Sequence, residues 1–223
     1  MITLALDAST YTGTAAVLKE GRVAAACEAT MRGRDAEALM PAIAAVMRRA
    51  GVSPHELSQV ICGAGPGSFT SLRIAASIAK GLALGIGCPL FAVSSLALLA
   101  ARRGASSAGQ YLAVLDALRG EAYVGGYSFH SQSGFSVILR ERIVRQADVA
   151  SLAVSLGATT IGPGQSIDAG PHASAVLAVE SLIGSSRGVD LGSWEPYYGR
   201  KAEAQMRWEA AHGQPLPSGG SHA

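Results

Sequence analysis

The sequence predicts an α/β protein built from two similar halves, and three observations indicate this class. Hydrophobic residues make up 49% of the 223 residues, which is enough to fill a substantial core. In each half, β-rich runs come first and apolar residues at helical spacing follow. A glycine-rich loop then follows a short strand in both halves. We therefore expect a duplicated α/β unit, although the halves show no clear repeat and the duplication rests on element order.

The first half is predicted to open with three antiparallel strands and to continue with helices and strands in alternation. Turn residues such as Glu20-Gly21 separate the strands, and Gly51 ends the first helix. A short helical turn follows Ser53. The expected strands are residues 2–6, 14–18, 22–30, 59–62 and 90–93. The expected helices are residues 36–50, 70–84 and 95–102.

The second half repeats this order after a small, polar segment at residues 103–110, which we take as the linker between two domains. The domains are then residues 1–104 and 105–211. Residues 212–223 are rich in Gly, Pro and Ser and are expected to be disordered. The expected strands are residues 111–116, 122–129, 135–140 and 159–161. The expected helices are residues 146–156 and 173–183.

Charged residues are few, at 15% of the chain against about 25% in ordinary soluble domains. Few charges leave apolar surface uncovered, and an unusually large partner interface would hide it. An alanine-rich composition with ordinary burial explains the same number. The net charge of +2 is too small to indicate nucleic-acid binding.

Cysteine usage and the N-terminal residues predict a cytoplasmic protein. The three cysteines, Cys27, Cys62 and Cys88, are odd in number and widely spaced, which fits neither a disulfide framework nor a zinc site. No stretch reaches the roughly 18 unbroken apolar residues of a membrane span. The first residues also lack the basic region of a signal peptide.

A polar turn follows the first predicted strand and contains Asp7, Ser9 and Thr10. Amides and hydroxyls in such a hairpin can hold a phosphate, with Asp7 near a magnesium ion. The same residue types also bond their own backbone in ordinary turns. These residues alone leave both interpretations open.

A glycine-rich loop, residues 63–70, lies between a predicted strand and a predicted helix. A helix N-terminus beneath such a loop can bind an anion, which makes Gly65, Gly67 and Ser68 candidates for phosphate contacts. The loop lacks the lysine of a P-loop, and Ser68 replaces the third glycine of a dinucleotide-binding fingerprint. A turn that only directs the following helix is equally consistent, because Pro66 removes one amide donor.

The first two predicted helices carry apolar and small residues that could form a seam with another protein or could be internal core. Arg73 lies in the first turn of its helix, where a cation opposes the helix dipole. We therefore expect an anionic neighbour, either a carboxylate of this chain or a group of a partner. The candidate interface residues are Leu39, Met40, Ile43, Met47, Arg73, Ile74, Ile78 and Leu82.

The sequence lacks the patterns typical of metal sites and has no serine-hydrolase motif in its expected setting. No two histidines are spaced i, i+4 on a predicted helix, and no cysteine–histidine cluster occurs. The spacing Gly-x-Ser-x-Gly occurs at residues 184–188, which follow a predicted helix and not the strand that a nucleophile elbow requires. We therefore expect no catalytic residue and no metal site.

Several segments together resemble the TsaB (YeaZ) family. Residues 4–10 are similar to its opening strand and Asp-containing turn. Residues 63–74 are similar to its run Gly-x-Gly-Pro-Gly-Ser-Phe-Thr-Gly-x-Arg-Ile, with Ser71 in place of a glycine. The resemblance covers residues 1–130 well and the remainder thinly. Further similar segments are residues 78–85, 93–96, 115–117, Gly120-Glu121, Tyr123 and 195–198.

The resemblance implies an actin-like ATPase (ASKHA) fold, shared with sugar kinases and Hsp70, with two similar α/β subdomains. It implies a non-catalytic scaffold in tRNA processing, in the complex that makes N6-threonylcarbamoyladenosine at position 37 of tRNAs reading codons that start with A. The implied partners are catalytic TsaD, bound through the first two helices, and the ATPase TsaE. It implies a homodimer when alone, indirect contact with tRNA and no membrane.

The resemblance also bears on chemistry. TsaD carries a His-x-x-x-His metal motif, whereas the corresponding helix here starts at Arg34 and has no histidine. No cofactor is implied as a requirement, although ATP or ADP could bind at the interface with partner proteins.

Two alternatives remain. A phosphotransferase of the same fold would use Asp7 for magnesium, but it needs a general base that we cannot identify. A glycoprotease-like peptidase of the M22 type would need a nucleophile or metal site that the sequence does not supply.

Overall fold

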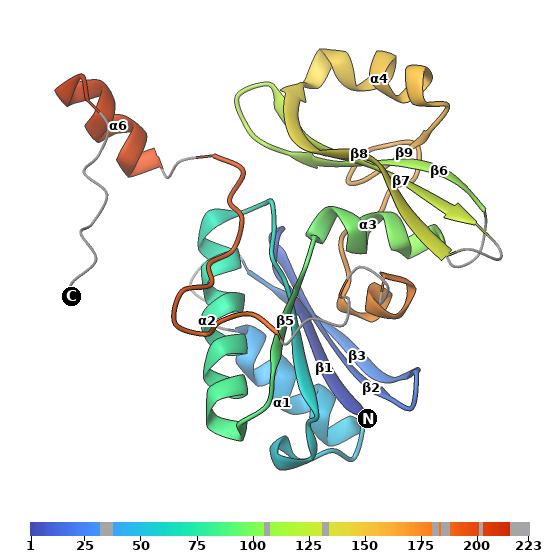
Figure 1. Ribbon diagram of the computed structural model, residues 1–223, viewed down its shortest axis with the longest axis vertical. Helices are drawn as coiled ribbons and strands as arrows, with labels where there is room; N and C mark the ends of the chain where they lie inside the picture. Colours follow the sequence, from blue (N-terminus) through green and yellow to red (C-terminus); the bar gives the residue numbers. More distant parts are fainter. Residues whose placement is uncertain are drawn as a thin grey trace.

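The computed structural model describes residues 1–31, 38–104, 108–130, 134–179, 183, 188–200 and 203–214. Within these residues, the chain forms two β-sheets with helices packed against them (Figure 1). Parts of four predictions lie outside the described residues. They are the start of the helix at residues 36–50, the middle of the linker, the end of the helix at residues 173–183 and the tail beyond residue 214.

The first sheet has five strands in the order β3-β2-β1-β4-β5. The first three strands form an antiparallel meander, and β4 and β5 run parallel to β1. All five strands are those expected from the sequence, with β2 longer at both ends. Their bounds are β1 Ile2–Asp7, β2 Thr12–Lys19, β3 Arg22–Thr30, β4 Gln59–Gly63 and β5 Leu90–Val93.

Alternating side chains of the first sheet serve two cores. Leu4 and Leu6 of β1 pack with α1 (Leu39–Arg49) and α2 (Phe69–Ile86). Ala5 points to the opposite face, which α3 (Ser95–Gly104) covers. The short 3-10 helix η2 (Pro54–Glu56) matches the turn expected after Ser53.

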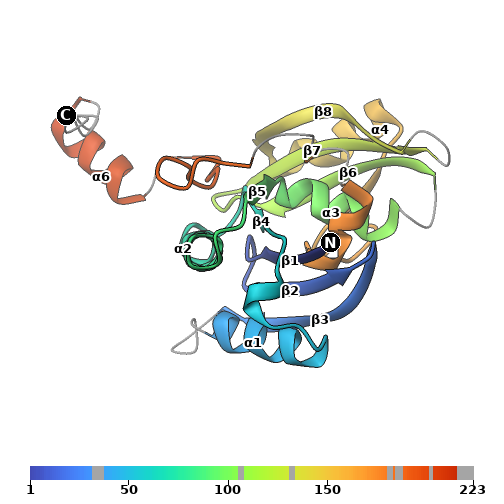
Figure 2. The ribbon, with the colours of Figure 1, turned by 60° about the horizontal axis from the view of Figure 1, so that its bottom comes forward.

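The second sheet repeats the meander and has the order β8-β7-β6-β9, with β9 parallel to β6. One face packs on α3, which therefore lies between the two sheets (Figure 2). The other face is covered by α4 (Val149–Leu156), which follows the 3-10 helix η3 (Gln146–Asp148). The strands are β6 Gly109–Asp116, β7 Glu121–His130, β8 Gly134–Arg145 and β9 Thr159–Ile161.

The chain returns to the first sheet after β9. The 3-10 helix η4 (Ala173–Val179) packs in the core shared with α3, where an α-helix was expected. The amide of Val189 then donates to the carbonyl of Leu90 at 2.7 Å, beside β5. The last helix, α6 (Glu203–His212), was not predicted and projects away from the sheets (Figures 1 and 2). The exact domain boundaries stay a prediction.

Helix α2 is long and apolar enough to cross a membrane by length and composition, with 18 residues and a mean hydropathy of 1.3. It connects β4 and β5, which pair in parallel within one sheet, so both of its ends return to that sheet. Ala75, Ala79 and Ala83 face the core. In this structure, α2 is therefore the crossover helix of a parallel strand pair.

Candidate functional site

The carboxylate of Asp7 lies at the end of β1 and is completely buried. Its Oδ1 accepts hydrogen bonds from the Ser9 amide at 3.0 Å and the Ser9 hydroxyl at 2.8 Å. Its Oδ2 accepts one from the hydroxyl of Ser95, the first residue of α3. Burial raises the pKa of Asp7, and the bonds from Ser95 and Ser9 oppose that rise. A magnesium ion could reach this carboxylate only by displacing its serine partners.

Three amides of the glycine loop, residues 63–70, bond within the chain. Ala64 donates to the carbonyl of Val93 at 2.7 Å, and Gly65 donates to Ser95 Oγ at 3.1 Å. The amide of Ser68 donates to the carbonyl of Ser9 at 2.7 Å. Because an anion site needs converging free amides, these bonds remove Ala64, Gly65 and Ser68 as donors to a phosphate.

The glycines of this loop allow close approach by the chain itself. A Cβ at Gly63 would lie 2.8 Å from Asp7 Cγ. A Cβ at Gly65, where φ is +89°, would meet the Tyr197 carbonyl, and a Cβ at Gly67 would lie 2.8 Å from the carbonyl carbon of Ser9. Five of the predicted site residues therefore lie close together, and they contact one another and neighbouring segments of the chain. They are Asp7, Ser9, Gly65, Gly67 and Ser68.

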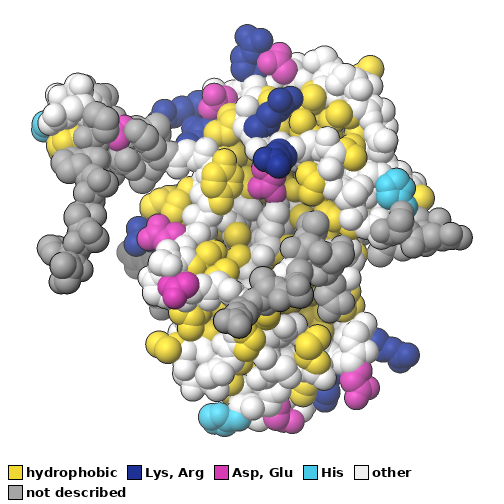
Figure 3. Space-filling model, viewed as in Figure 1, with side chains coloured by type: hydrophobic (Ala, Val, Ile, Leu, Met, Phe, Trp, Pro, Cys, Tyr) yellow, Lys and Arg dark blue, Asp and Glu magenta, His cyan; other side chains and the backbone are white. Residues whose placement is uncertain are grey.

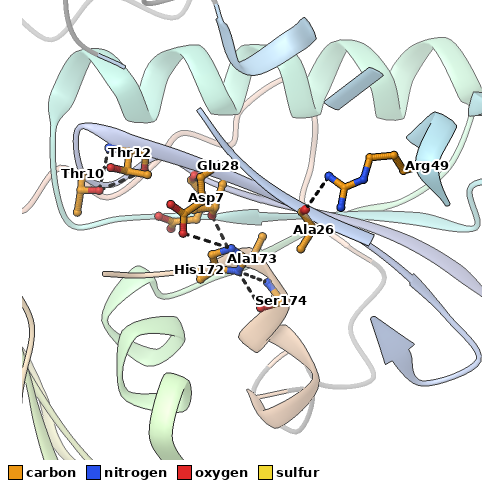
Figure 4. A network of polar contacts seen from close by, with 10 residues as sticks. Asp7, Thr10, Thr12, Ala26, Glu28, Arg49, His172, Ala173 and Ser174 are labelled. Carbon is orange, nitrogen blue, oxygen red and sulfur yellow. Dashed lines mark hydrogen bonds and ion pairs between the residues drawn. The ribbon is translucent and has the colours of Figure 1, made fainter. Parts of the chain in front are cut away.

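Thr10 is bonded elsewhere in the hairpin. Its hydroxyl donates to the carbonyl of Thr12 at 3.1 Å and accepts the Thr12 amide at 3.2 Å (Figure 4). The Ser68 and Ser71 hydroxyls lie 3.0 Å apart at the start of α2. Thr10 and Ser68 thus take part in turn and helix-start contacts.

The start of η4 closes the side of this site. The Thr14 hydroxyl donates to the Asp7 carbonyl at 3.3 Å and accepts the Ala173 amide at 3.0 Å. The adjacent His172 Nδ1 accepts the Ser174 amide at 3.0 Å, and its Nε2 lies 3.8 Å from Glu28 Oε1 (Figure 4). Burial, and secondarily the charge of Arg102, lowers the pKa of His172.

Two segments that bind the glycine loop were assigned no role in the sequence analysis. Ser95 donates its amide to the Gly65 carbonyl at 2.9 Å. From the other side, Tyr197 donates its amide to the Ala64 carbonyl at 2.7 Å. Their only sequence signal was that residues 93–96 and 195–198 belong to the segments similar to the TsaB family.

The predicted partner seam divides into core and surface. Leu39, Ile43 and Met47 belong to the core of this chain, with exposed fractions of 0%, 0% and 5%. Buried side chains cannot contact a partner in this fold. Of the four predicted interface residues on α1, only Met40 is exposed, by 42%. On α2, the side chains of Ile74, Ile78 and Leu82 are half-buried against the core.

Arg73 is exposed on the first turn of α2, and its guanidinium lies 5.5 Å from the centre of the Phe69 ring. None of the ion pairs found among the described residues includes Arg73, so the expected internal carboxylate is not found there. On the face seen in Figure 3, basic and acidic side chains lie interspersed between apolar ones. This face carries no large area of one charge.

The second half has a turn and glycine loop of similar form. Asp116 ends β6, and its Oδ1 accepts the Leu118 amide at 2.7 Å, as Asp7 accepts the Ser9 amide. A shallow cavity of about 260 Å³ lies beside it. In the part of the chain that the structure describes, no group of three His, Cys, Asp or Glu side chains is placed to hold a metal ion.

These features define an α/β protein whose glycine loop is filled by its own chain. A sequence model of the family described as "TsaD: tRNA N6-adenosine threonylcarbamoyltransferase" matches residues 32–167, more than half of the chain. The TsaB protein of Bacillus subtilis is 36% identical over 129 residues, 58% of this chain and 56% of that protein. The Escherichia coli TsaB protein is 35% identical over 127 residues, 56% of this chain and 54% of that protein.

Among solved structures, YeaZ from Pseudomonas aeruginosa matches with a TM-score of 0.76 and 28% identity, over 88% of this chain and 99% of that chain. The chain belongs to the family of this TsaD model, and it is similar to TsaB proteins and to YeaZ. The predicted α/β fold with two similar halves is confirmed by the two sheets, each of which has an antiparallel meander and parallel pairing on its other side. The aligned segment spans about half the length of the curated relatives.

Proposed function

We propose that this chain is a non-catalytic scaffold in the biosynthesis of N6-threonylcarbamoyladenosine at position 37 of tRNAs reading codons that start with A. The similarity to proteins named for tRNA threonylcarbamoyladenosine biosynthesis supports the process. The observation that carries the non-catalytic role is the enclosed Asp7, whose carboxylate bonds Ser9 and Ser95.

The proposed partners are the catalytic subunit TsaD and the ATPase TsaE, with tRNA held by the complex. The exposed part of the seam on α1 and α2 is the proposed contact with TsaD, and the chain is proposed to pair with itself through the same helices when alone. Arg73 fits this role because its guanidinium is exposed on the first turn of α2. The proposed setting is cytoplasmic and away from membranes.

No cofactor is proposed as a requirement of the chain itself, and ATP or ADP is proposed to bind at the interface with partners. The phosphotransferase alternative has weaker support. It needs Asp7 to hold magnesium and the loop amides to hold phosphate, whereas Ala64, Gly65 and Ser68 donate their amides within the chain. The peptidase alternative has no described nucleophile or metal group to support it.

Reconstitution tests the proposal. TsaD and TsaE of the same organism are supplied with tRNA, ATP and the source of the threonylcarbamoyl group, and modified tRNA is measured with and without this chain. Modification should depend on the chain, and Asp7→Asn should keep activity in proportion to its folded fraction. Full modification without the chain would contradict the scaffold role. Steady ATP turnover by the pure chain, abolished by Asp7→Asn, would favour the phosphotransferase.

A further inference from the structure

Two tyrosines of the second sheet point toward the glycine loop of the first half. Tyr123 and Tyr127 lie four residues apart on β7, so their side chains share one face of the strand. That face packs in the core around α3, and only 5% and 1% of the two residues are exposed. A buried tyrosine hydroxyl needs a hydrogen-bond partner, and each of these finds one across the boundary between the sheets or beside it.

The first connection passes through Ser94 and Ser95. The Tyr127 hydroxyl donates to Glu141 Oε1 at 2.9 Å, and the Ser94 hydroxyl donates to the same carboxylate. Glu141 therefore joins Tyr127 to Ser94, whose Oγ lies 3.3 Å from the Tyr127 hydroxyl. The next residue, Ser95, exchanges two hydrogen bonds with Gly65. Burial raises the pKa of Tyr127, so its hydroxyl remains a donor at neutral pH. A single peptide bond therefore separates Ser94, which is joined to Tyr127 through Glu141 of β8, from Ser95, which holds the loop.

The second connection has the same logic on the other side of the loop. The Tyr123 hydroxyl donates to the Tyr198 carbonyl at 2.9 Å. The preceding residue, Tyr197, donates its amide to the carbonyl of Ala64 at 2.7 Å. Packing is tight here, since a Cβ at Gly199 would lie 3.0 Å from Tyr123 Cδ1. One peptide bond again separates the group that binds β7 from the group that binds the loop.

Both connections end on neighbouring residues, Ala64 and Gly65, which precede α2 by only a few positions. The loop is thus held from two sides by residues whose neighbours are bonded to the other sheet, through Tyr123 on one side and through Tyr127 and Glu141 on the other. We propose that Tyr123 and Tyr127 are positioning residues that set the glycine loop, and through it the first turn of α2, from the second sheet. The consequence for partner binding rests on the proposed function, whereas the positioning itself does not.

Residue-resolved amide hydrogen exchange on the full chain tests the inference. Tyr127→Phe should speed exchange of the Ser95 and Gly65 amides by about tenfold relative to wild type, and Tyr123→Phe should do so for the Tyr197 amide. Tenfold corresponds to about 1.4 kcal/mol, within the range for one buried hydrogen bond. Tyr111→Phe is the matched control, because it removes the hydroxyl of another buried tyrosine of the same sheet.

Faster exchange confined to the expected side in each variant would support the inference. Exchange at these amides equal to that of the Tyr111→Phe control, or a uniform increase throughout the chain, would overturn it.

Affinity for TsaD, measured by calorimetry on the same variants, addresses the consequence separately. A loss of at least several-fold beyond the control would place the effect at α2. Unchanged affinity together with faster loop exchange would overturn the extension to α2. Failure of the wild-type chain to bind TsaD would count against the proposed function, and the exchange pattern would still decide the positioning.

Discussion

Replacing Gly67 with alanine is expected to lower the free energy of unfolding by about 2–4 kcal/mol. The added Cβ would lie 2.8 Å from both the Cα and the carbonyl carbon of Ser9, and nearer still to its carbonyl oxygen. These are backbone atoms, so they cannot rotate away. Overpacking of this kind costs about 1–3 kcal/mol. Loss of the hydrogen bond from the Ser68 amide to the Ser9 carbonyl adds about 1 kcal/mol.

Urea unfolding followed by circular dichroism measures this change through the transition midpoint at constant slope. Gly81→Ala is the matched control, because a Cβ at Gly81 meets nothing within 4 Å inside α2 and alanine should stabilise a helix by up to about 1 kcal/mol. A Gly67→Ala midpoint equal to wild type, with the expected gain for Gly81→Ala, would refute the argument. Lost nucleotide binding at unchanged stability would show instead that the loop is a ligand site.

Three further predictions concern protonation and the partner surface. Burial raises the pKa of Asp7, so its contribution to stability is greatest below its ordinary pKa of 3.8 and declines as pH rises through the folded pKa. In urea unfolding, the amount by which Asp7→Asn is less stable than wild type should therefore shrink from pH 4 to pH 7. A stability difference that widens over this range would contradict the prediction. The pKa of His172 is lowered, so its contribution to stability is complete above its ordinary pKa of 6.5 and is lost as pH falls. Wild type should therefore lose stability between pH 7 and pH 5, and His172→Gln should lose less. An equal loss in both proteins would argue against this role of His172. Met40→Glu should change the free energy of unfolding by no more than about 0.5 kcal/mol yet weaken TsaD binding, measured by calorimetry, at least tenfold. Val154→Glu on α4 is the exposed control, and Ile43→Glu should unfold the chain because Ile43 is buried. Equal TsaD affinity of the Met40 and Val154 variants would exclude Met40 from the contact.

Elements with a strong local signal were predicted well from the sequence. The meander of the first half alternates apolar runs with turn residues, and α2 has apolar residues at helical spacing that ends at Gly87, where φ is +77°. Helix α6 was missed because residues 203–212 are good helix formers without an apolar face to reveal them. The segment at Ala173–Val179 is apolar on several sides, so its pattern did not distinguish a 3-10 helix from an α-helix.

The site was predicted in its local part and not in its long-range part. The bond from the Ser9 amide to Asp7 follows from ordinary turn chemistry two residues apart. The contacts of Asp7 with Ser95 and of Ala64 with Tyr197 join segments far apart in the chain, and no local pattern encodes such a pairing. The predicted partner seam included residues that belong to the core of this chain, such as Ile43. Helical spacing shows which residues share a face of a helix, but it does not show whether that face packs on the chain's own sheet or on a partner.

The glycine loop shows why composition alone could not decide between a ligand and a turn. Glycine is needed wherever another group comes within contact distance of the backbone, and a phosphate and a backbone carbonyl impose the same requirement. Here the approaching groups are the Asp7 carboxylate, the Ser9 backbone and the Tyr197 carbonyl, which a Cβ at Gly63, Gly67 or Gly65 would meet. Ser9 lies in the turn of the first meander and Tyr197 lies outside it, so their positions beside the loop depend on the tertiary fold of the whole chain. The glycines of the loop therefore indicate that some group approaches the backbone closely. Which group approaches is determined by residues more than fifty positions away in the sequence.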